Sequence, residues 1–264
     1  KNEVILDNLN ADKWIIAKSE TIELKNKIKQ KGELLKDWQI KIKYGIKNGF
    51  NEAFIIDTQT KDELIKKDKN ASKIIKPILR GRDVHKYSVE WAGLWLIVTK
   101  NGININDYPS VYEYLKSFGQ KIKSRQDQGD NWWNLRACSY YDLFEKEKLI
   151  YPETTVRRSE FFYDNKGRYI DKTCFMITGE NLKFLNGVLS SKLLEWYLES
   201  ELRLLGKRSI QYSKQFIEQV PVPKISESNL YPSNEIIKLV DQLLKLNEEK
   251  AEAKLETKIN QLKH

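Results

Sequence analysis

The hydrophobic and polar positions along the chain switch repeatedly between a strand period and a helix period. Trp38 to Tyr44 alternates strictly between apolar and polar side chains, which predicts a half-buried strand. Ala53 to Ile56 follows a glycine-bounded turn and is the expected partner of that strand. Leu94 to Val98 is apolar throughout, which predicts a central strand. Lys148 to Tyr151 and Thr173 to Thr178 are the other expected strands.

Helical spacing governs the longer segments between these strands. Tyr108 to Arg125 and Asn181 to Leu205 carry apolar residues on one stripe, and each is expected to form a single helix. Residues 12–36 have the pattern of a helical lead-in that Gly32 interrupts. Asn165 to Gly167 is a hairpin-turn signal. We therefore expect an α/β fold, of the α+β kind, with helices packed on a mixed sheet.

The last part of the chain, from Ser233 onward, has the pattern of a charged helix. Its apolar positions form two seams: Leu239, Leu243 and Leu246, then Leu255, Ile259 and Leu262. A solvated helix of this kind is unstable by itself, so it must lie on its own domain or on another part of a longer protein. We accordingly divide the chain into a globular domain over residues 1–223 and a linker with a C-terminal helix over residues 224–264.

Charge is concentrated on the globular part. The formal net charge is +9, from 46 Lys and Arg against 37 Asp and Glu. Residues 233–264 hold equal numbers of lysines and acidic residues, so the positive excess lies on residues 1–232. Such an excess favours a polyanionic partner such as nucleic acid, although extra lysines can also do no more than solvate a surface.

Composition also limits the cellular setting. No apolar run approaches the ~18 residues of a membrane span, and no signal peptide opens the chain. The two cysteines, Cys138 and Cys174, favour a reducing, cytoplasmic setting. The chain begins with Lys1 and its only methionine is Met176, so we expect it to be a piece of a longer protein.

Lys43 to Tyr87 carries the densest set of special residues. Gly45 and Gly49 bracket Lys47 and Asn48, and glycine lets a backbone approach another backbone or a phosphate. Further along, Arg80 and Arg82 flank Gly81 beside Asp83. Arginine forks suit phosphate and guanine recognition, but an arginine paired with Asp83 would serve only to lock a turn.

Several motifs resemble the TaqI-like C-terminal specificity domain. They are Tyr44–Phe54, Lys76–Asp83, Lys148–Glu153, Gly187–Leu193 (with Ser190 where that family usually has Asn) and Gln219–Pro223. The resemblance covers roughly Trp14 to Pro223. It implies the target-recognition part of a type IIG restriction–modification enzyme or a related adenine-N6 DNA methyltransferase. Such a domain binds double-stranded DNA for a methyltransferase or nuclease module that lies N-terminal in the same polypeptide.

The sequence lacks the motifs that the catalytic chemistry of such enzymes needs. An adenine-N6 methyltransferase needs a Gly-rich cofactor loop and an N-P-P-Y-type tetrapeptide, and neither occurs. No Pro-Asp dipeptide of a metal-dependent nuclease occurs, and His85 is the only internal histidine. We therefore expect no catalytic, cofactor or metal site here, and we place S-adenosylmethionine and Mg²⁺ in other modules of the parent enzyme.

Recognition is the remaining chemistry, because Arg and Lys can read guanine while Asn and Gln can read adenine. We expect DNA contacts from three clusters and four other arginines. The first cluster is Lys47, Asn48 and Asn51, the second is Arg125, Asn131, Asn134 and Arg136, and the third is Lys207, Arg208, Gln211 and Tyr212. The other arginines are Arg80, Arg82, Arg157 and Arg158. In the second cluster, at least one of Trp132 and Trp133 is expected to pack in the core.

Two alternatives remain open at this point. The chain can be half of a type I restriction specificity subunit, which pairs recognition domains with long helices. It can also be a protein–protein scaffold whose lysine excess is incidental. Salt-dependent binding to duplex DNA separates the scaffold from both DNA-binding possibilities.

Overall fold

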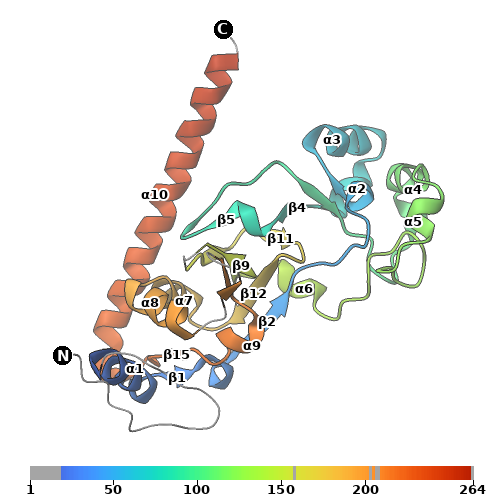
Figure 1. Ribbon diagram of the computed structural model, residues 1–264. Helices are drawn as coiled ribbons and strands as arrows, with labels where there is room; N and C mark the ends of the chain where they lie inside the picture. Colours follow the sequence, from blue (N-terminus) through green and yellow to red (C-terminus); the bar gives the residue numbers. More distant parts are fainter. Residues whose placement is uncertain (1–18, 157–158, 202–203, 206–208, 263–264) are drawn as a thin grey trace.

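An antiparallel four-stranded sheet forms the centre of the computed structural model, which describes residues 19–156, 159–201, 204–205 and 209–262 (Figure 1). Its strand order is β10 (Phe162–Asp164), β8 (Lys148–Pro152), β12 (Cys174–Gly179) and β2 (Ile40–Tyr44). Every residue of β8 is buried, because this inner strand has covered faces on both sides.

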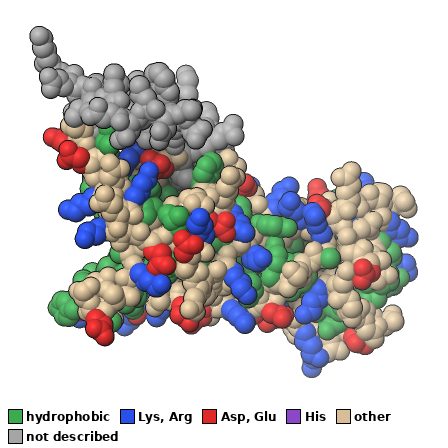
Figure 2. Space-filling model, turned by 90° about the horizontal axis from the view of Figure 1, so that it is seen from below, with side chains coloured by type: hydrophobic (Ala, Val, Ile, Leu, Met, Phe, Trp, Pro, Cys, Tyr) green, Lys and Arg blue, Asp and Glu red, His purple; other side chains and the backbone are tan. Residues whose placement is uncertain are grey.

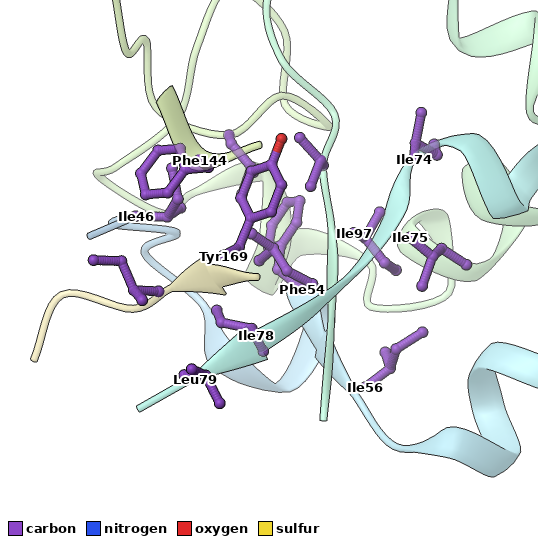
Figure 3. Close-up of a cluster of buried hydrophobic side chains, with 14 of the residues drawn as sticks. Ile46, Phe54, Ile56, Ile74, Ile75, Ile78, Leu79, Ile97, Phe144 and Tyr169 are labelled. Carbon is purple, nitrogen blue, oxygen red and sulfur yellow. The ribbon is translucent and has the colours of Figure 1, made fainter. Parts of the chain in front are cut away.

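A second four-stranded sheet has the order β11 (Tyr169–Ile170), β4 (Ile75–Leu79), β7 (Trp95–Ile97) and β3 (Ile55–Ile56). Only its β11–β4 pair is parallel. Figure 3 shows Phe54, Ile78 and Tyr169 within one cluster of apolar side chains at this sheet, and all three are buried. The fold is thus α/β with mixed pairing, as the hydrophobic pattern predicted.

Three small β-structures surround the two sheets. β1 (Glu33–Leu34) pairs with β15 (Pro221–Val222), and β5 (Val84–His85) pairs with β6 (Ser88–Val89). The third structure has the order β13 (Leu204–Leu205), β14 (Ser209–Gln211) and β9 (Thr154–Thr155).

The helices divide between the two sheets (Figure 1). Those beside the second sheet are α2 (Asn51–Phe54), α3 (Thr58–Lys67), α4 (Pro109–Lys116) and α5 (Gln120–Lys123). Those nearer the central sheet are α1 (Ser19–Lys31), α6 (Tyr141–Phe144), α7 (Leu182–Leu189), α8 (Lys192–Glu201), α9 (Lys214–Ile217) and α10 (Leu230–Leu262).

Several local predictions are wrong in their partners or lengths. β3 pairs with β7 rather than with β2, so the two halves of the glycine turn belong to different sheets. The turn at Asn165–Gly167 joins β10 to β11, which also lie in different sheets, so it closes no hairpin. The helix expected over Tyr108–Arg125 breaks at Gly119, where φ is 61°. The one expected over Asn181–Leu205 is interrupted after Leu189 and becomes α7 and α8.

The C-terminal helix α10 lies on its own domain, but not through the first of the two predicted seams. The side chains of the second seam, Leu255, Ile259 and Leu262, lie outside the described ones. Ile236 and Val240 face α7, and a Cβ added to Gly187 of α7 would lie 2.4 Å from the Cγ2 of Ile236. Gly187 therefore permits a close helix–helix approach. Leu239 and Leu243, by contrast, are exposed.

The described residues hold neither a membrane-spanning helix nor a metal-binding group of side chains. No helix among them is long and apolar enough to cross a bilayer. Within the same residues, no group of three or more His, Cys, Asp and Glu side chains is placed to hold a metal ion. Cys138 and Cys174 are both free thiols.

Candidate nucleic-acid interface

The Arg80–Asp83 turn, between β4 and β5, gives its first arginine a structural role. The Arg80 guanidinium forks onto the Asp83 carboxylate, with Nε–Oδ2 at 3.0 Å and Nη2–Oδ1 at 2.8 Å. The Arg80 backbone N–H donates to the same carboxylate at 2.9 Å. Hydrogen bonding to Asp83 raises the pKa of Arg80. Asp83 is buried, so this pair holds the turn.

Arg82 has the opposite environment, two residues from Arg80. Its side chain is exposed, and it forms no ion pair with any residue of the described ranges. The turn that carries it is fixed a second time, because the Gly81 N–H donates to Thr173 Oγ1 at 2.7 Å. A rigid backbone thus presents an unpaired guanidinium, a group that binds phosphate or the edge of guanine.

A cleft of about 600 Å³ lies beside Arg82, between the Arg80–Asp83 turn with β5 and the strand β9. Three carboxylates line it, from Glu153, Glu160 and Asp171. The Glu160 carboxylate is already engaged, with Oε2 at 3.3 Å from His85 Nδ1. Burial raises the pKa of Asp171. Carboxylates repel phosphate, so the cleft favours base edges over the DNA backbone.

The opposite wall of the cleft offers an apolar contact. Val156 lines it and is 62% exposed. In the major groove, an apolar side chain contacts the thymine methyl group, arginine reads guanine, and a carboxylate accepts from the cytosine amine. The cleft therefore places three kinds of base-reading group within one small region.

The glycine turn carries the first predicted cluster, and its members separate by burial. Lys47 is exposed, with its Nζ at 5.4 Å from the centroid of the Tyr44 ring. Asn51 is exposed at the start of α2. Asn48 is buried, and its Oδ1 accepts from the Phe50 N–H at 3.0 Å, so it stabilises the turn.

Arg125 of the second cluster is buried and connects separate segments of the chain by hydrogen bonds. Its guanidinium lies 4.6 Å from the centroid of the Phe54 ring. Burial lowers its pKa to about 10. It donates to four backbone carbonyls, those of Asn48, Ile122, Trp132 and Asn134. We therefore assign Arg125 to holding the loop against the glycine turn.

Asn134 is likewise buried and saturated. Its Nδ2 donates to the carbonyls of Thr99 and Lys100, at 3.3 and 3.2 Å. Its Oδ1 accepts from both the N–H and the Nδ2 of Asn131, which is itself exposed. Trp132 and Trp133 are half-buried and pack against the core, in line with the expectation that at least one does so.

Arg136 lies close to the first cluster. It is exposed, with Nη1 at 2.9 Å from Asp127 Oδ1. Together with Lys47 it lines a pocket of about 140 Å³ whose other members include Tyr44 and Tyr140. The structure thus brings Lys47 and Arg136, members of two separate predicted clusters, onto one surface.

Two tyrosines between these cations were not expected to take part. The rings of Tyr44 and Tyr140 meet edge to face at 5.9 Å, and the Tyr140 hydroxyl donates to the Tyr44 carbonyl at 3.2 Å. Lys43 Nζ lies 5.3 Å from the Tyr140 ring centroid. We call Lys43, Tyr44, Lys47, Arg136 and Tyr140 the tyrosine–lysine cluster. The alternating pattern assigned Tyr44 to a buried face, but it ends β2 and is 43% exposed.

Lys207 and Arg208 of the third cluster lie outside the described residues, as do Arg157 and Arg158. Gln211 ends β14, opposite Thr154, and its Nε2 donates to Glu153 Oε1 at 3.4 Å. Tyr212 is buried against Phe161, and burial raises its pKa to about 12, so it belongs to the core.

Antiparallel pairing of β14 with β9 places Ile210 opposite Thr155. The register therefore brings Val156 and Ser209 to the same end of this sheet, where the described parts of the two segments stop.

The surface charge differs between the two parts of the face drawn in Figure 2. Basic side chains predominate over the lobe formed by α2 to α5, while both signs mix over the rest of that face.

The mixed α/β fold exposes arginine, lysine and tyrosine side chains, which are groups that can contact nucleic acid. Residues 76–222 match the sequence profile of the TaqI-like C-terminal specificity domain. Because the match covers more than half of the chain, the protein belongs to this family. It is a DNA target-recognition module of the restriction–modification type.

Two curated relatives are named type II methyltransferases. The chain is 24% identical over 208 residues to the type II methyltransferase M.MjaIV of Methanocaldococcus jannaschii, covering 74% of this chain and 68% of that protein. It is 20% identical over 223 residues to the type II methyltransferase M.PaeR7I of Pseudomonas aeruginosa, covering 81% of this chain and 38% of that protein. The chain thus spans well under half the length of the second relative.

Solved structures with the same fold are larger still. The type IIL restriction–modification enzyme MmeI, in complex with DNA, matches with a TM-score of 0.60 at 14% identity, covering 83% of this chain and 29% of that one. The type IIG restriction endonuclease BpuSI matches with a TM-score of 0.54 at 14% identity, covering 84% and 28%. These likenesses establish the fold.

Proposed function

We propose that the chain selects a short duplex-DNA sequence for an adenine-N6 methyltransferase or nuclease module that precedes it in one polypeptide. Its family, the methyltransferase names of its relatives, and the greater length of its structural neighbours support this proposal. S-adenosylmethionine and Mg²⁺ bind in those other modules. Residues 1–223 form the recognition domain, and residues 224–264 form a linker and helix.

The observation that carries the proposal is the tyrosine–lysine cluster. Lys43, Lys47 and Arg136 come together around two aromatic rings, although Lys47 and Arg136 lie far apart in sequence. Lysine ammonium groups bind phosphate as point charges. The Tyr140 hydroxyl already donates to the Tyr44 carbonyl, so the two rings serve to hold the cations in place. The cluster positions the DNA backbone and carries no sequence information of its own.

The Arg82 cleft is the proposed base-reading surface. Arg82 is exposed on a turn that the Arg80–Asp83 pair and Thr173 hold in place. An arginine that reads a nucleobase benefits from a rigid backbone beneath it, because the entropy lost when a mobile side chain is ordered opposes binding. Carboxylates around Arg82 weaken its attraction for phosphate, so a guanine edge is its favoured partner.

The remaining predicted contacts form the second part of the reading surface. Arg157, Arg158, Lys207 and Arg208 belong to segments whose described neighbours, Val156 and Ser209, lie at one end of the β14–β9 pair. We retain these four residues, with Gln211, as base or phosphate contacts. Asn51, Asn131 and Arg136 remain surface contacts, whereas Asn48, Arg80, Arg125, Asn134 and Tyr212 support them from within.

A salt titration of duplex binding tests the proposal. If about six phosphates are neutralised, log K should fall against log salt with a slope near −5. The Lys43→Ala/Lys47→Ala double variant should bind more weakly and reduce the magnitude of the slope by about two. Lys224→Ala, which removes an exposed lysine next to β15, is the matched control and should leave the slope unchanged. Binding that is absent at low salt, or insensitive to salt, would favour the scaffold alternative.

A further inference from the structure

An apolar seam runs along the side of α10 that does not touch the domain. Leu239 and Leu246 are each 54% exposed, and Leu243 is 39% exposed. The three residues follow the i, i+4, i+7 spacing that lines one helix face. Large apolar side chains gathered in this way on a surface commonly mark an interaction site.

The domain itself uses a different face of α10. Val240 is 2% exposed, and Ile236 and Leu244 pack against the core. On the same side, Asn247 Nδ2 donates to the Tyr87 carbonyl at 3.2 Å, and Lys183 Nζ lies 2.7 Å from Asp241 Oδ1. These contacts fix the orientation of the helix, so the leucine seam is held outward.

The seam forms part of a long helix and is open to solvent. α10 has 33 residues and is about 50 Å long at the standard rise per residue. Figure 1 shows that its C-terminal end projects beyond the rest of the domain. The three seam leucines lie in the first half of the helix and are exposed, so a second helix can pack against them.

The charges beside the seam reverse sign about its centre. Glu235 and Lys238 precede Leu243, while Glu249 and Lys250 follow it. In an antiparallel pair of identical helices centred near Leu243, Glu235 of one copy faces Lys250 of the other. Lys238 likewise faces Glu249. A parallel, in-register arrangement would not bring these opposite charges together.

We propose that α10 is a self-association surface, on which a second copy of this chain pairs antiparallel through Leu239, Leu243 and Leu246. Leu239 of one copy packs beside Leu246 of the other, and the two Leu243 side chains meet at the two-fold axis. Such an interface is isologous, as in most closed homodimers. The contact covers only a few helical turns, so the dimer is weak and forms at micromolar concentrations.

The first experiment measures the mass of the whole chain by analytical ultracentrifugation over a wide concentration range. A reversible monomer–dimer equilibrium is expected, and Leu243→Lys should abolish it. Leu193→Lys is the matched control, because Leu193 is 46% exposed on α8 and lies away from the seam. A chain that stays monomeric at every concentration overturns the proposal, as does a dimer that Leu243→Lys does not weaken.

A second experiment tests the antiparallel register. Lys238→Glu and Glu249→Lys should each weaken the dimer, and combining them should restore it. Under mild oxidation, Leu243→Cys should form a disulfide-linked dimer, whereas Glu235→Cys should not, since the two copies of residue 235 lie at opposite ends of the contact. Efficient cross-linking of Glu235→Cys would show a parallel pair and overturn the assignment. None of these outcomes depends on DNA binding.

Discussion

Arg80 and Asp83 share two parallel hydrogen bonds, Nε–Oδ2 at 3.0 Å and Nη2–Oδ1 at 2.8 Å, and this fork divides the R-G-R-D motif by function. The side chain of Asp83 is only 4% exposed and that of Arg80 is 25% exposed. Arg80 thereby becomes part of the scaffold. Arg82, on the same turn, is left to face the cleft.

Removing one partner of this fork should destabilise the fold. Arg80→Ala leaves a buried carboxylate without its cation, and we expect a loss of about 2–4 kcal/mol in the free energy of unfolding. The Arg80→Met/Asp83→Leu double variant should lose less, because no unpaired charge stays buried. Urea denaturation followed by circular dichroism measures both. A double variant that is less stable than Arg80→Ala would contradict this account.

Arg82 and Lys47 should differ in what they contribute to DNA binding. Arg82→Ala should cost about 1–3 kcal/mol on the cognate site and relax the preference at one base pair. Lys47→Ala should weaken cognate and random DNA alike, because a phosphate contact carries no sequence information. A selection from random duplexes with both variants measures the two effects. If Lys47→Ala changes the selected sequence and Arg82→Ala does not, the roles are reversed.

The sequence predicted which segments are strands better than it predicted their partners. Alternation identified β2, and the apolar run at Leu94–Val98 identified β7 as an inner strand. Periodicity sets which face of a strand is buried, but it does not select a neighbour. The pairing of β3 with β7 therefore replaced the expected local pairing with β2.

In the candidate site, the sequence predicted the role of a glycine but not the burial of an arginine. Gly45 was expected to permit close backbone approach, and a Cβ there would lie 1.9 Å from the Asp171 carbonyl oxygen. Arg125 resembles a surface cation in sequence. Its carbonyl partners come from separate segments, including Asn48 and Trp132, so only the folded chain shows that it is internal.

Tyr212 should make the fold sensitive to alkaline pH. Burial raises its pKa to about 12, above the ordinary value of 10.0. A raised pKa of an acid means that the folded state favours the protonated phenol. The protonated phenol therefore stabilises the folded state fully below pH 10. This stabilisation, about 2–3 kcal/mol, is lost as pH rises toward 12.

Tyr212→Phe should accordingly flatten the loss of stability between pH 10 and 12. Tyr231 is 78% exposed, so Tyr231→Phe is the matched control and should leave the pH profile unchanged. Guanidinium titrations at a series of alkaline pH values provide the comparison. Identical profiles for Tyr212→Phe and the unmodified chain would show that this phenol does not titrate with unfolding.

The residues before β14 give the last prediction, which concerns how the reading surface is divided. Lys207 and Arg208 follow Gly206 in the sequence, and Gln211 is held by Glu153 at 3.4 Å. Arg208→Ala should cost about 1–3 kcal/mol on the cognate site and relax the preference at one or two base pairs. Gln211→Ala should change the preference less, because its amide already has a protein partner.

The measurement is methylation profiling by the full-length parent enzyme carrying each variant, with Lys47→Ala as the comparison. An altered set of methylated sites for Arg208→Ala, with an unaltered but less methylated set for Lys47→Ala, is the expected result. If Arg208→Ala only lowers overall methylation, then Arg208 is a phosphate contact and base reading belongs to the Arg82 cleft. If neither variant has an effect, Asn131 and Arg136 become the stronger candidates for DNA contact, because both side chains are exposed.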